Sequence, residues 1–207
     1  MPTTQIRPAR PAHPARPVGE AAADLHPRFD ADPLRALLHP GRDLWTPSQL
    51  RELTTSVASG FRAELTDLVR YTRPQRWWAR LGLTEGVELW LLSWAPGQGT
   101  EPHDHGGAAG SFTVLEGELH EDFRHPGGQV GTATRRAGAA LGFGAGRAHQ
   151  VRNTSEANAS SVHAYSPPLV PTRDYRSLWD IPTTIPPLPA HRLPLDRLRE
   201  LADLEGP

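Results

Sequence analysis

The chain has 207 residues, a length that fits one domain with a sizeable core, and a formal net charge of −1. This near-neutral charge gives no electrostatic reason to expect binding to nucleic acid or to an anionic membrane. The sequence contains no cysteine, which excludes disulfides, thiolate metal sites and cysteine nucleophiles. Because no apolar run approaches the roughly 20 residues of a membrane span and no signal peptide is visible, we expect a cytoplasmic protein.

The N-terminal third of the sequence divides into a tail and a helical part. Residues 1–24 are rich in Pro, Ala and Arg without apolar periodicity, which predicts a disordered Pro/Arg-rich tail. Residues 25–207 are predicted to form a single domain, and about residues 33–71 to be helical. A capping-box pattern begins at Thr46 and predicts a helix N-terminus there. The apolar positions that repeat at helical spacing behind it are Leu50, Leu53 and Val57.

Short strands separated by glycine-rich turns are predicted between about residues 85 and 170. Residues 87–94 form a strong strand pattern, and residues 111–115 and 118–123 predict two strands joined by a tight turn. Many short strands at this spacing indicate an antiparallel sandwich or barrel. A proline-rich wrap and a short amphipathic helix near Leu195 follow. The predicted fold class is therefore all-β and mainly antiparallel, with N-terminal helices and a short C-terminal helix.

His103 and His105 are the first residues that indicate chemistry. Residues i and i+2 of a strand point to the same face, so both imidazoles can reach one ion. Gly97 and Gly117 flank the pair as in the first motif of the cupin superfamily. The second cupin motif is matched by Gly138, Gly144, Gly146, His149 and Asn153, with Gly144 in place of the usual proline. The chain thus resembles a cupin, which implies a β-sandwich or jelly-roll barrel around one metal ion.

The sequence departs from the cupin motif where a carboxylate ligand is usual, because Ala109 and Gly110 occupy those positions. The predicted site therefore consists of three neutral histidines, His103, His105 and His149. Such a site leaves the 2+ charge of the metal uncompensated and one face open to an anionic or thiolate substrate. Imidazole also binds Zn, Ni and Cu, so the ligand type alone does not select iron.

A narrower resemblance extends over roughly residues 45–180. The Tyr71-Thr72-Arg73 segment, the three histidines and the SVHAYSPP segment at residues 161–168 together resemble the thiol dioxygenases of the cysteine dioxygenase family. The resemblance implies one Fe(II) per chain and an enzyme that oxidises L-cysteine with O2 to cysteine sulfinic acid. The site residues that it implies are the iron ligands His103, His105 and His149, the substrate-binding residues Arg73 (a carboxylate clamp) and Tyr71, and the relay Tyr165, His163 and Ser161.

Elementary chemistry supports these roles. Ser161, His163 and Tyr165 alternate along one predicted strand, so all three can face the same cavity. A phenol near O2 can donate a hydrogen bond to a developing oxygen anion, and the guanidinium of Arg73 suits bidentate binding of a carboxylate. Animal members of the family cross-link a cysteine to the active-site tyrosine. This chain has Gly110 at that place, so Tyr165 is expected to act as an unmodified phenol.

Several alternatives remain open from the sequence. Relatives that oxidise 3-mercaptopropionate carry Gln in place of the clamp arginine, so Arg73 favours L-cysteine, with 3-mercaptopropionate or another small thiol as the alternative. A non-catalytic metal-binding cupin and a Zn or Ni cupin with isomerase or hydrolytic chemistry are further hypotheses. His163 alone could be a buried structural histidine. The expected partners are a small thiol and O2, with no nucleic acid and no membrane, in a monomer or weak homo-oligomer.

Overall fold

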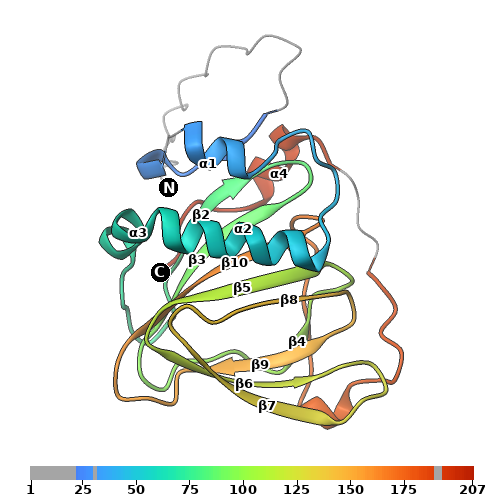
Figure 1. Ribbon diagram of the computed structural model, residues 1–207. Coiled ribbons are helices and arrows are strands. Elements are labelled where there is room, and N and C mark those ends of the chain that lie inside the picture. Colours follow the sequence, from blue (N-terminus) through green and yellow to red (C-terminus); the bar gives the residue numbers. More distant parts are fainter. Residues whose placement is uncertain (1–21, 30–31, 189–192) are drawn as a thin grey trace, which may run out of the picture.

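Two antiparallel sheets make up most of the computed structural model, which describes residues 22–29, 32–188 and 193–207 (Figure 1). All strand pairs between the named strands are antiparallel, which confirms the predicted fold class. The six-stranded sheet runs in the order β1 (Asp24–Leu25), β2 (Trp78–Leu83), β3 (Glu88–Trp94), β10 (Ala159–Ser166), β5 (Ala109–Glu116), β8 (Ala140–Phe143). The five-stranded sheet runs β11 (Arg173–Asp174), β4 (His103–Asp104), β9 (Ala148–Arg152), β6 (Glu118–Arg124), β7 (Val130–Arg136).

The helices precede and follow the sheets. The predicted capping box is present at the start of α2 (Pro47–Gly60), where the Thr46 hydroxyl accepts from the Gln49 backbone and the Gln49 side chain accepts from the Thr46 backbone. Helix α2 lies across β5, β8 and β10 on the outer face of the six-stranded sheet (Figure 1). The remaining helices are α1 (Asp32–Leu37), α3 (Arg62–Leu68), α4 (Leu195–Leu201) and the 3-10 turns η1 (Pro27–Phe29) and η2 (Leu178–Asp180).

Alternation along β3 separates the core from the site. Leu89 and Leu91 point outward into the apolar core under α2, together with Leu50 and Val162. The alternate side chains of β3 point inward and line a cavity between the sheets; they are Glu88, Trp90, Leu92 and Trp94. Because side chains alternate along the strand, one face of β3 packs in the core and the other faces the cavity.

Three of the predicted strands are found where expected, as β3, β5 and β6. The short strands β1 and β11, of two residues each, carry no sequence pattern of their own and were not predicted. Strand β4, also of two residues, begins at His103, the first histidine of the pair that was predicted to lie on a strand. The predicted disordered tail falls mainly on residues 1–21, outside the described part of the chain. Its last residue, Asp24, is instead paired with Leu83 in β1. No helix of the described residues is long and apolar enough to cross a membrane.

Replacing Leu50 by Ala tests the packing of α2 on the sheet. Leu50 is fully buried, so Leu50→Ala should lower the free energy of unfolding by about 2–5 kcal/mol. Thermal denaturation should show a fall in melting temperature of roughly 5–15 °C. Leu44, which is 68% exposed, provides the control: Leu44→Ala should change the unfolding free energy by less than about 0.5 kcal/mol. Equal losses in the two variants would contradict this description of the core.

Candidate metal centre

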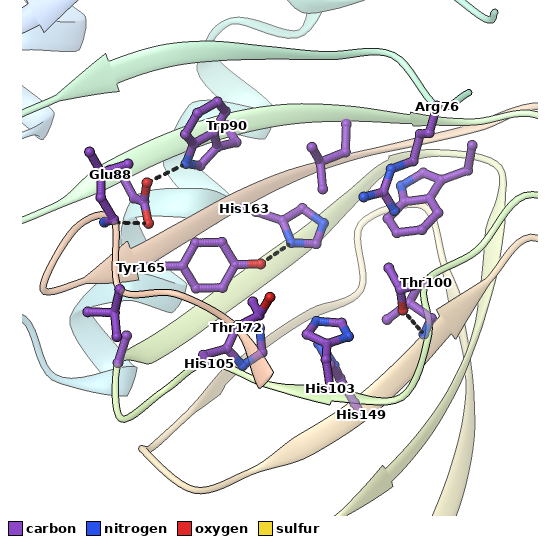
Figure 2. Close-up of a pocket in the computed structure, with 16 residues that line it drawn as sticks. Arg76, Glu88, Trp90, Thr100, His103, His105, His149, His163, Tyr165 and Thr172 are labelled. Atoms are coloured by element: carbon purple, nitrogen blue, oxygen red, sulfur yellow. Dashed lines mark hydrogen bonds between the residues drawn. The ribbon is translucent and has the colours of Figure 1, made fainter. Parts of the chain in front are cut away.

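Three histidines come together on the five-stranded sheet. His103 of β4 and His149 of β9 are direct partners in the antiparallel register, and His105 follows two residues later on the same side (Figure 2). One ring nitrogen from each lies within 4.8 Å of the others. The sequence motifs predicted all three histidines, and the strand register places His149 beside His103. The trio can hold one metal ion.

The hydrogen bonds of the ring nitrogens fit a metal site. Nδ1 of His103 donates to the Glu101 carbonyl at 2.8 Å, which leaves the Nε2 lone pair free. Nδ1 of His149 bonds a Glu121 carboxylate oxygen at 2.9 Å, with the same result. Neither ring nitrogen of buried His105 makes a hydrogen bond of normal geometry among the described residues, although the Arg147 backbone lies near the ring. A buried nitrogen without a partner is unfavourable, and a metal ion would satisfy it.

Burial keeps these imidazoles neutral. It lowers the pKa of His103 to about 4 and holds the pKa of His105 well below its usual value, with the nearby histidines adding to both effects. The pKa of His149 is also lowered, mainly by burial. Neutral imidazoles keep their lone pairs at neutral pH, as metal ligands must.

Glu121 of β6 orients His149. Its carboxylate is fully buried, pairs with Arg147 at 2.8 Å and with Arg135 at 2.8 Å, and accepts from His149. Burial alone would raise the pKa of Glu121, but the hydrogen bond from His149 and the two guanidinium groups outweigh it and lower the pKa. An ionised carboxylate behind a ligand fixes its tautomer and ring orientation. This residue was not predicted from the sequence.

Asp104 of β4, between His103 and His105, faces away from the cavity. Its side chain is fully buried. Its carboxylate accepts from the backbone of Gly106 at 2.6 Å, from Arg173 Nε at 3.1 Å and from the Tyr175 hydroxyl at 2.5 Å. These bonds tie the two-residue strand β4 to the C-terminal wrap.

The predicted relay residues form one hydrogen-bonded chain on β10. Nε1 of Trp94 donates to Ser161 Oγ at 2.8 Å, and Ser161 Oγ lies 2.8 Å from His163 Nε2. His163 Nδ1 lies 3.0 Å from the Tyr165 hydroxyl (Figure 2). Because Trp94 already donates to Ser161, the Ser161 proton is free to donate to Nε2. Nδ1 then donates to Tyr165, and the phenol proton is available to the cavity.

Tyr165 lies directly over the metal centre. Its ring stacks on His105 with 4.9 Å between the centroids, and burial raises its pKa, so the phenol stays protonated. Its cross-strand partner is Gly110. A Cβ atom at Gly110 would lie 2.4 Å from the ring of Phe143, so Phe143 fills the space beside the phenol.

The two predicted substrate-binding residues lie outside the cavity. Arg73 is exposed and donates to the carbonyl of Pro96 at 3.0 Å, and neither Arg73 nor Tyr71 lines the cavity. The Tyr71 hydroxyl lies 3.5 Å from a Glu116 oxygen instead. Arg76, three residues further on, does line the cavity. The sequence does not distinguish the two arginines because the segment before β2 is irregular, and no periodicity indicates which side chain points inward.

Two further cavity residues were not predicted from the sequence. The guanidinium of Arg76 lies 4.1 Å over the ring of Trp94, and its buried Nε and Nη1 have no hydrogen-bond partner among the described residues. Glu88 is buried at the other end of β3, and burial raises its pKa to about 7. The cavity that these residues share with the three histidines has a volume of about 310 Å³. Its aromatic lining includes Trp90 and Trp94.

Comparisons with known proteins identify the family. The family model for cysteine dioxygenase type I matches residues 51–177, whereas the search of curated proteins gave no match. Among solved structures, TT1209 from Thermus thermophilus is 28% identical over 50% of this chain and 93% of its own, with a TM-score of 0.44. An oxalate oxidase with the substrate analogue glycolate is 24% identical over 44% of this chain, with a TM-score of 0.41. That match spans 47% of the oxalate oxidase chain. Because the family model covers more than half of the sequence, this chain belongs to the cysteine dioxygenase type I family of cupin metal-dependent dioxygenases.

Proposed function

We propose that this protein is a non-haem Fe(II) thiol dioxygenase that converts L-cysteine and O2 to cysteine sulfinic acid. The observation that carries the proposal is that three neutral histidines, a protonated phenol and an unpaired guanidinium face one cavity. Fe(II) held by His103, His105 and His149 would supply the activation of O2 beside the substrate sulfur. The remaining residues bind the substrate, orient it and hold protons. An alternative substrate is 3-mercaptopropionate or another small thiol with a carboxylate.

The electrostatics of the centre favour a thiolate. All three ligands are neutral, so a divalent ion keeps its full charge until an anionic substrate binds. The only carboxylate hydrogen-bonded to a ligand ring, among the described residues, is Glu121, and Arg135 and Arg147 already balance its charge. The cavity volume lies at the lower end of the range for small-molecule sites, which suits a small thiol.

Arg76 is suited to bind the substrate carboxylate. Stacking on Trp94 holds its guanidinium plane, and the buried Nε and Nη1 are free to donate. Burial of a cation without a hydrogen-bonded anion is unfavourable, so a carboxylate ligand would relieve it. The clamp role that was predicted for Arg73 therefore passes to Arg76 in this proposal.

Tyr165 is suited to stabilise negative charge that develops on the substrate. Burial raises its pKa, and burial also holds the pKa of His163 well below its usual value, so both are neutral at pH 7. With Nδ1 of His163 donating to the phenol oxygen, the phenol proton can be donated into the cavity. Preorganised donors of this kind contribute without rearrangement during the reaction.

The proposed function is tested by measuring the iron content and the reaction product of the same protein. Iron-loaded protein should hold about one Fe(II) per chain and consume O2 with L-cysteine to give the sulfinic acid, measured by iron analysis, an oxygen electrode and mass spectrometry. His105→Ala should lose both iron and turnover, because two remaining ligands hold a labile divalent ion poorly. The exposed His125 gives the control, and His125→Ala should retain both. No O2 uptake with any small thiol would overturn the proposal.

The phenol is tested with Tyr165→Phe, which removes only the hydroxyl. Iron content should be nearly unchanged, while kcat for L-cysteine falls roughly 10-fold or more because a hydrogen bond made in the transition state is lost. Tyr71→Phe, outside the cavity, should leave kcat unaltered. An unchanged kcat for Tyr165→Phe would make Tyr165 a packing residue.

The two arginines are a matched pair for testing carboxylate binding. Arg76→Gln should lower kcat/KM for L-cysteine about 10- to 100-fold, mostly through KM, because a charge-assisted contact holds the substrate in both ground and transition states. Arg73→Gln should behave like the wild type. Cysteamine, which has no carboxylate, should be a poor substrate and insensitive to both changes. An equal loss of kcat/KM in the two variants would contradict the assignment of the clamp role to Arg76.

A further inference from the structure

The cavity has oppositely charged groups at its two ends. Arg76 lies at the Trp94 end of β3, and Glu88 lies at the start of the same strand. Six residue-to-residue steps along the extended strand place the Cα atoms of Glu88 and Trp94 about 20 Å apart. In Figure 2, His163 and Tyr165 lie between the two charged side chains, and the three histidines face them. The cavity therefore continues past the metal centre, away from Arg76.

Glu88 is held in place but its charge is not paired. Its carboxylate accepts from Trp90 Nε1 at 2.9 Å and from the Leu169 backbone at 3.1 Å. Among the described residues it forms no ion pair, since the neighbouring Arg80 pairs with Asp24. A carboxylate has about four acceptor positions, so two remain for a ligand. A buried anion without a paired cation is unfavourable, and a cationic ligand would stabilise it.

The walls around Glu88 fit the chain of a ligand rather than a second ion. Trp90, Leu169 and Val170 line this end of the cavity with apolar surface. Trp90 and Leu169 also hold the carboxylate through the two bonds described above, so its position is fixed before a ligand arrives. Such a pocket suits a short aliphatic chain that ends in a hydrogen-bond donor.

We propose that Glu88 forms a second subsite, which binds the ammonium group of an amino thiol longer than cysteine. The proposal rests on the proposed thiol dioxygenase function and names a substrate class for it: a thiol with a carboxylate at the Arg76 end and an amine several bonds away. L-cysteine carries both groups on one carbon, so it cannot reach both ends of the cavity. A cysteine extended at nitrogen by an aminoacyl group carries its ammonium on a separate carbon, further from the carboxylate than in L-cysteine.

The test compares ligands that differ only in the ammonium group. Glycylcysteine and N-acetylcysteine share thiol, amide and carboxylate, and β-alanylcysteine extends the amine by one methylene. Binding to iron-loaded protein is measured anaerobically by calorimetry at pH of about 7.5, where the ligand amine is mostly protonated and Glu88, with a pKa of about 7, is mostly ionised. At least one aminoacyl thiol should bind about 10-fold or more tightly than N-acetylcysteine.

A pair of variants assigns this preference to Glu88. Glu88→Gln should bring the affinity ratio of the aminoacyl thiol to N-acetylcysteine close to one, whereas Glu118→Gln, a change on the partly exposed β6 surface, should preserve it. Equal binding of all three ligands to the wild type overturns the inference even if Glu88→Gln does not fold. An unchanged ratio in folded Glu88→Gln also overturns it.

Failure of this inference and failure of the proposed function are separable. Binding is measured without O2, so charge discrimination that depends on Glu88 supports the subsite even if no thiol is oxidised. In that case only the dioxygenase proposal is contradicted. Conversely, formation of cysteine sulfinic acid without any preference for the aminoacyl thiols retains the dioxygenase and overturns the subsite.

Discussion

The antiparallel pairing of His103 with His149 is the contact on which the metal centre depends. It places ligands from two distant parts of the sequence side by side, yet β4, which pairs with β9 and β11, has only two residues. Asp104 gives this short strand further support through hydrogen bonds with Gly106, Arg173 and Tyr175. The C-terminal wrap, which carries Arg173 and Tyr175, is therefore part of the metal site although none of its residues is a ligand.

The charged groups around the metal centre are of two kinds, those paired within the barrel wall and those that face the cavity. Glu121 orients His149, but Arg135 and Arg147 neutralise it within the wall of the barrel. The ligands can thus be fixed by a strong acceptor without its charge opposing the binding of an anionic substrate. Arg76 and Glu88, by contrast, face the cavity without ion pairs among the described residues. Their unpaired charges make the cavity selective for what it binds, and the paired charges in the wall make it rigid.

The sequence predicts features that depend on short-range patterns, but it does not predict which side chains the tertiary fold places in the cavity. The strands at β3, β5 and β6, the capping box of α2 and the histidine spacing are all short-range patterns, and the structure contains them. Arg73 and Arg76 lie three residues apart in an irregular segment, and only the path of the chain into β2 decides which one enters the cavity. Glu88 and Glu121 occupy alternating strand positions that look solvated, because the sequence does not show that a second sheet covers them.

Strand β10 links the chemistry to the stability of the fold. Ser161, His163 and Tyr165 form the relay on its cavity side, while Val162 and Ala164 are buried in the core against α2. A shift of this strand by one residue would exchange the two faces, placing polar groups under the helix and apolar groups over the metal. The apolar contacts of α2 therefore fix the register of the relay. Packing that contacts neither metal nor substrate thus determines whether the phenol of Tyr165 lies over His105.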